Sequence, residues 1–199
     1  MEGLRPYDAL PDSIDHNGQT YGLDLSYAAV FAATDALQDT RLDDLRRLRA
    51  ALSLLVDGPP PPDDPELLGA IVALIRQEDR HDDGPQTLDI VQDWPYICAA
   101  FQQAYGIDLY ADKTIHIIRF RALLQGLPKD TKMAEIVGIR SAKIPAATKY
   151  NREQIADLTR LKSIYALHGS KVSLQEGWAK LAETLIARAN SNGSRGRIG

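Results

Sequence analysis

The pattern of apolar and polar residues predicts one short β-hairpin at the start of the chain, followed by helices. Ser13–His16 and Gln19–Tyr21 flank the dipeptide Asn17-Gly18. Asn-Gly readily supplies the positive φ angles of a type I′ turn, so the two flanking segments are expected to pair. Because an isolated hairpin is only marginally stable in water, this one needs helices to pack against.

From Ser26 onward, apolar residues recur every three or four positions, which is the period of a helix with one buried face. The predicted helical segments are 26–37, 40–57, 64–75, 93–106, 115–126, 130–140, 151–167 and a last one that opens at Ser173. The segment 64–75 has an apolar stripe that is expected to be buried, made of Leu67, Leu68, Ile71, Val72 and Ile75. The segment 151–167 continues the helical pattern through Ile155, Leu158, Leu161, Ile164 and Tyr165.

Several helix ends carry recognisable caps. Thr40, with Asp43 three residues later, is expected to cap the second helix, and Asp64 precedes a proline at the first position of the third. Asp93 is expected to cap the fourth helix, which Gly106 ends in the left-handed conformation.

The predicted fold class is therefore mostly α, a helical bundle with a small N-terminal β-hairpin. Four stretches are distinguished: 1–78 with the hairpin and first helices, 79–92 as an acidic loop, 93–169 as a helical core, and 170–199 as an extra helix and flexible tail. One compact domain and two small lobes both fit this order, and an up-and-down bundle is the default where loops are short.

Composition narrows the class of protein. The 199 residues are 44% hydrophobic and 25% charged, which is typical of a globular chain, and no apolar run approaches a membrane span. The first residues lack a signal-peptide pattern, so the protein is expected in the cytoplasm of the cell that makes it. A single cysteine, Cys98, excludes an internal disulfide and a cysteine-based zinc site within one chain.

Charge is unevenly distributed along the chain. Residues 1–100 hold 7 basic and 19 acidic residues, a net charge of −12, and residues 101–199 hold 16 and 8, a net charge of +8. Such a chain could bind an acidic surface through its second half, or pair head to tail with copies of itself. Mutual neutralisation of the two halves within one chain is the alternative.

The search for catalytic groups predicts no enzyme, no cofactor and no metal site. The run His81-Asp82-Asp83 resembles a ligand set, but an acidic solvated loop is the better interpretation. His116, in an apolar segment, is expected to be a hydrogen-bonded core or interface residue. The second half is basic, yet Arg119 and Arg121 fall on different helix faces and no nucleic-acid motif accompanies them, so nucleic-acid binding is not favoured.

Several ordered blocks over about residues 10–168 resemble the bacteriophage gene-product-fifteen family. They are Leu10–Ile14 with the Asn17-Gly18 turn and Tyr21, Tyr96–Phe101, Gln103–Leu109, Arg119–Leu124 with Gly126-Leu127, Asp130–Lys132, Ile136–Arg140 and Tyr165–Leu167. Ser170–Gly199 extends beyond the part that the family usually covers.

The resemblance implies a non-enzymatic tail-assembly chaperone in the host cytoplasm. Such a protein would bind the tape measure protein and keep it soluble until tail tube subunits displace it, and would self-associate into a ring or spiral. A permanent virion component, such as a connector, and a nucleic-acid adaptor are the alternatives. The candidate partner-binding residues are Phe101, Tyr105, Arg119, Phe120, Arg121 and Arg140. For Phe101 and Phe120 a place in the core is favoured over partner binding, because apolar aromatic residues at helical spacing usually pack inside.

Overall fold

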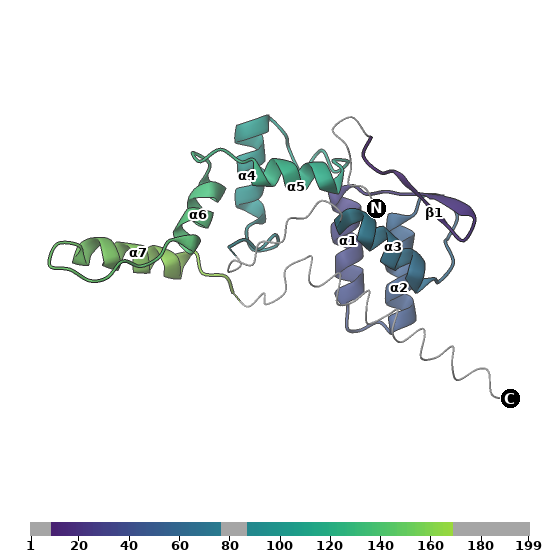
Figure 1. Cartoon of the computed structure of the whole chain (residues 1–199), viewed down its shortest axis with the longest axis horizontal. Helices are drawn as coiled ribbons and strands as arrows, with labels where there is room; N and C mark the ends of the chain where they lie inside the picture. The colour runs from purple at the N-terminus through teal and green to yellow at the C-terminus, as the bar shows by residue number, and fades with distance from the viewer. Residues whose placement is uncertain (1–8, 77–86, 169–199) are drawn as a thin grey trace. The chain divides into compact units, whose positions relative to one another are not determined.

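The computed structural model describes residues 9–76 and 87–168 (Figure 1). Its elements are β1 (Ser13–His16), β2 (Gln19–Gly22), α1 (Tyr27–Gln38), α2 (Asp44–Leu55), α3 (Pro65–Arg76), α4 (Trp94–Tyr105), α5 (Ile117–Gln125), α6 (Lys132–Ser141) and α7 (Arg152–Ile164). The mostly α fold with an N-terminal hairpin is confirmed. The predicted acidic run His81–Asp83 and the predicted C-terminal helix and tail lie outside the described residues.

The hairpin forms as its turn predicts. Strands β1 and β2 pair antiparallel, with Ile14 opposite Tyr21 and His16 opposite Gln19. Asn17 and Gly18 have φ angles of 51° and 78°, the left-handed values that a type I′ turn requires. The turn chemistry alone therefore sets the register of this hairpin.

The described residues divide into two compact units, and residues 9–76 with 113–121 make the first unit. In it α1 packs on α2 and α2 packs on α3. The five stripe residues of α3 are all buried, as predicted. The segment 113–121 belongs to this unit although it lies within the stretch 93–169 in sequence. The two units are therefore not consecutive along the chain.

Two boundaries in the first unit differ from the prediction. The N-cap of α2 is Asp43, whose Oδ1 accepts the amide of Arg46 at 2.8 Å, and Thr40 lies in a preceding turn held by Asp39. His116 lies just before α5, because the backbone on both sides of it pairs with the extended residues that precede α1. These long-range backbone bonds delay the start of the helix.

Residues 87–112 with 122–168 make the second unit. In it α4 packs on α6 and α6 packs on α7. Its buried core includes Ile97, Phe101, Leu109, Met133 and Ile136. Helix α4 ends at Gly106, whose φ of 67° confirms the predicted left-handed cap.

Helix α7 differs from the other helices in the exposure of its apolar residues. It forms close to where expected, but none of its residues is buried. Ile155, Leu158 and Leu161 are half-buried, and 55% of Ile164 is exposed. Figure 1 shows α7 projecting from α6 on the side away from α4, with its C-terminal end near α6.

Candidate functional site

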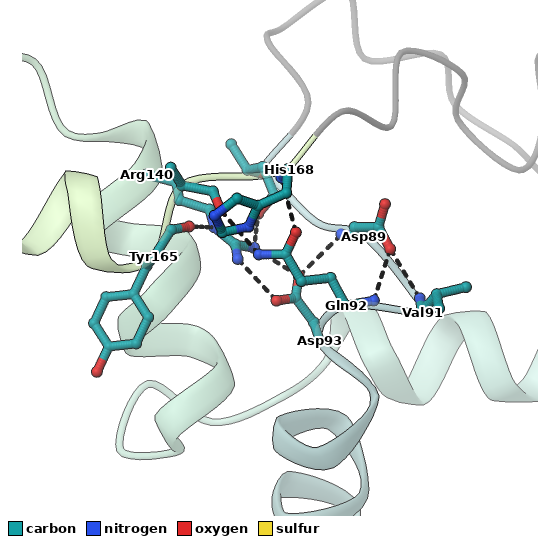
Figure 2. A network of polar contacts seen from close by, with 9 residues as sticks. Asp89, Val91, Gln92, Asp93, Arg140, Tyr165 and His168 are labelled. Carbon is teal, nitrogen blue, oxygen red and sulfur yellow. Dashed lines mark hydrogen bonds and ion pairs between the residues drawn. The ribbon is translucent and has the colours of Figure 1, made fainter.

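A buried ion pair joins α6 to the N-terminal end of α4. Arg140 donates through Nη1 and Nη2 to the two carboxylate oxygens of Asp93, at 2.6 and 2.8 Å. Only 7% of the arginine side chain and 1% of the aspartate side chain are exposed. Paired two-point contacts between guanidinium and carboxylate are among the stronger charge-assisted hydrogen bonds. Figure 2 shows the two groups facing each other.

The same arginine also binds two backbone carbonyl oxygens. Its Nε donates to Tyr165 O at 2.6 Å, and Nη1 donates to Thr87 O at 3.0 Å. Lys162 Nζ donates to the carbonyl oxygen of Arg140 at 2.6 Å. Arg140 therefore holds the C-terminal end of α7 as well as α4, and its buried charge is well satisfied.

Two residues beside this pair extend the network. Gln92 Nε2 donates to Ala166 O at 2.9 Å, and Gln92 Oε1 accepts the amide of His168 at the same distance (Figure 2). The amide of Asp89 donates to Asp93 Oδ2 at 2.9 Å. Asp93 thus caps α4 by position, with no side-chain bond to that helix, because its carboxylate is used by Arg140 and Asp89.

The predicted partner-binding residues of α4 are used within the second unit. Phe101 is fully buried, and its ring lies edge-on to Tyr105 with centroids 5.7 Å apart. The hydroxyl of Tyr105 donates to Leu123 O at 2.8 Å. Phe101 is therefore a core residue, as its alternative interpretation had it, and Tyr105 ties α4 to the end of α5.

The predicted residues of α5 are divided between core and surface. Phe120 is buried, stacking on Tyr27 with centroids 4.9 Å apart and lying edge-on to Phe31. Arg121 is half-buried and donates to Ile75 O at 2.5 Å. Only Arg119, of the six predicted residues, is exposed. The six do not form one exposed surface, and partner binding by any of them stays a prediction.

Several large apolar side chains of the second unit that are not buried lie on residues 142–164, here called the arm. The arm consists of the loop 142–151 and α7. Its large apolar side chains that are exposed or half-buried are Ile144, Tyr150, Ile155, Leu158, Leu161 and Ile164. In the loop, 50% of Ile144 and 90% of Tyr150 are exposed. Exposed apolar groups that gather on one element are typical of an interaction surface.

The end of the arm is ordered by its own hydrogen bonds. Asn151 Oδ1 accepts the amide of Thr148 at 2.7 Å, and Asn151 Nδ2 donates to Ala146 O at 2.9 Å. Asn151 stands at the N-cap of α7 but makes no side-chain bond to that helix. The turn is therefore held by Asn151, and it presents Lys149 and Tyr150 to solvent.

The titratable residues singled out from the sequence have local partners. His116 Nε2 lies 3.0 Å from Pro11 O, and its Nδ1 accepts the amide of Ile118 at 3.2 Å, so this histidine is hydrogen-bonded as predicted. Burial raises the pKa of the Cys98 thiol. Over residues 9–76 and 87–168, no three metal-ligating side chains come together. In the same part of the chain, no helix combines the length and apolar character of a membrane span.

These features define a class of protein. It is a small, mostly helical protein with an N-terminal hairpin and an apolar arm. The family model described as Bacteriophage Gp15 protein matches residues 7–167, which includes both units, the ion pair and the arm. The chain belongs to this family, and it is a bacteriophage protein. No curated protein and no solved structure matches the chain.

Sequence reasoning missed the partners of Arg140 and the exposure of the arm. Asp93 and Arg140 lie 47 positions apart, and neither stands in a pattern that points to the other. For the arm, a usable signal exists: Tyr150 lies alone between polar residues just before a helix. An isolated tyrosine in such a turn has no apolar neighbours in sequence with which to enter a core.

Proposed function

We propose that the protein is a non-enzymatic chaperone of phage tail assembly that binds the tape measure protein and keeps it soluble during tail morphogenesis. Membership of the Gp15 family supports a role in a bacteriophage. The observation that carries the proposal further is the apolar stripe of α7, none of whose residues is buried.

A stripe of this kind is suited to binding another amphipathic helix. Ile155, Leu158, Leu161 and Ile164 recur every three residues, so they wind round one half of the helix over about 14 Å of its axis. A helical client would lay its own apolar residues along them, as in helix-in-groove recognition. The client would be protected from aggregation because its apolar stripe would leave water.

The modest size of the stripe suits a chaperone that must later be displaced. Three of the four side chains are already half-buried, so each gains only part of its full burial energy when a client binds. Single contacts would be weak, and many copies along one long client would together hold it firmly. Tail tube subunits could then remove the copies one at a time.

Co-expression with the tape measure protein of the same phage tests the proposal. We expect affinity capture of this protein to recover the tape measure protein, and the soluble fraction of the tape measure protein to rise. The variant Ile155→Asp/Ile164→Asp should lose both effects, because two charges would enter the stripe. Ala156→Asp/Ser163→Asp is the matched control, since both residues are exposed and the charge change is the same.

Two results would contradict the proposal. One is a tape measure protein that precipitates to the same extent with or without this protein. The other is a stoichiometric amount of this protein in purified, finished tails, which would favour the alternative of a permanent structural or connector protein. Mass spectrometry of purified particles distinguishes a chaperone from a virion component.

A further inference from the structure

The arm carries an excess of positive charge among its unburied apolar side chains. Residues 142–164 hold five basic and two acidic residues, which gives a net charge of +3. One of the basic side chains, Lys162, is half-buried and donates to the carbonyl oxygen of Arg140. The other four are exposed, and none of them forms an ion pair with a carboxylate of residues 9–76 or 87–168. They are called the arm cations below: Lys143, Lys149, Arg152 and Arg160.

Several basic side chains in other parts of the described chain do have carboxylate partners. Six of them form ion pairs with aspartate or glutamate: Arg41, Arg46, Arg47, Arg49, Lys132 and Arg140. The arm cations have none, although α7 itself carries Glu153 and Asp157. Each arm cation can therefore meet a carboxylate of another molecule without giving up an ion pair that the structure shows.

On α7, the arm cations lie beside the two ends of the apolar stripe. Arg152 stands three positions before Ile155, and Arg160 stands four positions before Ile164. Side chains at these spacings are neighbours on one face of a helix. A partner that contacts the isoleucine at either end of the stripe would therefore also come close to a guanidinium group.

The loop of the arm repeats this combination of apolar and cationic residues. Lys143 directly precedes Ile144, and Lys149 directly precedes Tyr150, and all four side chains are exposed. The hydrogen bonds of Asn151 hold the turn around Tyr150 in shape before any partner binds. Tyrosine is among the residue types that most often anchor protein interfaces. The loop thus extends the surface of α7 with the same chemistry.

We propose that the client segment bound by the arm is an amphipathic helix whose apolar stripe is bordered by aspartate and glutamate. The inference rests on the proposed function, because it names the chemistry of the client that the arm binds. When the two apolar stripes meet, carboxylates at the border of the client stripe would face the arm cations. Complementary charges of this kind speed the encounter and select the partner.

The same charges exclude other occupants of the arm. A helix with an equally apolar stripe but lysine or arginine at its border would place like charges opposite the arm cations, which disfavours binding. The chain's own residues 169–199 carry five basic and two acidic residues, a net charge of +3, so they have the wrong sign to cover the arm. Selection by charge would let the protein distinguish its client from other amphipathic helices.

Two synthetic helical peptides test the inference without the tape measure protein. Both carry the same leucine stripe, which is bordered by glutamate in one and by lysine in the other. Fluorescence anisotropy with the full chain measures the two affinities. At low salt the glutamate peptide should bind at least about tenfold more tightly than the lysine peptide. The difference should shrink in about 0.5 M NaCl, because salt screens exposed charges.

Reversal of two arm cations gives the most specific result. Lys149→Glu/Arg152→Glu changes the net charge of the arm from +3 to −1, so the lysine peptide should now bind more tightly than the glutamate peptide. A variant that merely destabilised the arm would weaken both peptides alike. The matched control is Lys113→Glu/Lys129→Glu, which makes the same change at two exposed sites outside the arm and should keep the wild-type preference.

Four results would overturn the inference. They are equal affinity for the two peptides, no binding of either, a preference for glutamate that survives reversal, and single-stranded DNA that displaces the glutamate peptide and binds more tightly. The last would assign the arm cations to nucleic acid. Failure of the chaperone proposal is seen separately, as a tape measure protein that precipitates regardless of this protein while the peptide preference is unchanged.

Discussion

Helices α3 and α7 have nearly the same length and both carry regularly spaced apolar residues, yet these residues end in opposite environments. All five stripe residues of α3 are buried, and α7 has no buried residue. Helix α3 packs against α2, whereas α7 packs against α6 and is tied down by polar bonds near Tyr165. Amphipathic periodicity thus predicts a helix and its apolar face, but not whether the same chain covers that face.

The largest loss of stability is expected at the ion pair between Asp93 and Arg140, beside the end of α7. Asp93→Ala should lower the free energy of unfolding by about 3–5 kcal/mol, because Arg140 would keep a buried charge without its partner. Guanidinium unfolding followed by circular dichroism measures this loss. The double variant Asp93→Ala/Arg140→Ala should recover part of it, since it buries no lone charge. A loss below about 1 kcal/mol for the single variant would argue against a structural role for the pair.

The next prediction compares an apolar residue of α3 with one of α7. Leu68→Ala in α3 should cost about 2–5 kcal/mol of unfolding free energy, because the side chain is fully buried and leaves a cavity. Leu158→Ala in α7 should cost much less, since its side chain is only half-buried. Parallel denaturant titrations give both values. Equal losses at the two positions would mean that α7 is packed as tightly as α3.

A smaller effect concerns the cap of α3. Burial alone would raise the pKa of Asp64, but hydrogen bonds from His16 and from the amides of Glu66 and Leu67 hold it below its usual value. A lowered folded-state pKa stabilises the protein above the unfolded value of about 3.9, and this contribution disappears as pH falls through the folded pKa.

Asp64→Asn should therefore cost about 0.3–1 kcal/mol near neutral pH, because asparagine still caps the helix but lacks the negative charge. The gap between wild type and variant should narrow as pH falls below about 4, where the carboxylate becomes protonated. Unfolding measured across this pH range checks the sign. A gap that widens with acid would show that the ionised carboxylate does not stabilise the cap.

The smallest effect on stability should occur at the exposed end of the α7 stripe. Ile164→Ala should stay within about 0.5 kcal/mol of wild type, because more than half of the side chain is in water. The same variant should weaken capture of the tape measure protein in the co-expression experiment. If the variant lost stability but still captured the tape measure protein, Ile164 would be a packing residue and not a client-binding one.

Local signals in the sequence predicted most of the fold. The Asn17-Gly18 turn, the Asp64 cap and the Gly106 end are all set within a few residues, and the structure confirms each of them. The periodicity likewise located every described helix. Boundaries went wrong at Thr40 and His116, where turn bonds and long-range backbone pairing outweigh the local pattern.

The candidate site was harder to predict because it depends on contacts between distant segments. Arg140 was expected to bind a partner, but its guanidinium is used by Asp93 and by two carbonyl oxygens that only folding brings near. Phe101 and Phe120 have the size of interface anchors and the spacing of core residues. Both are buried in the structure, so they are core residues. Sequence alone cannot tell a stripe that the chain covers from one that a partner covers.

Hydrogen exchange of the α7 amides, with and without the tape measure protein, tests the central claim most directly. A helix of 13 residues with no buried side chain should open easily, so its amides should exchange much faster than those of α3 in the free protein. Binding of the client should slow them selectively. Amides of α7 that exchange as slowly as those of α3 without any partner, or that do not change in the complex, would contradict the account.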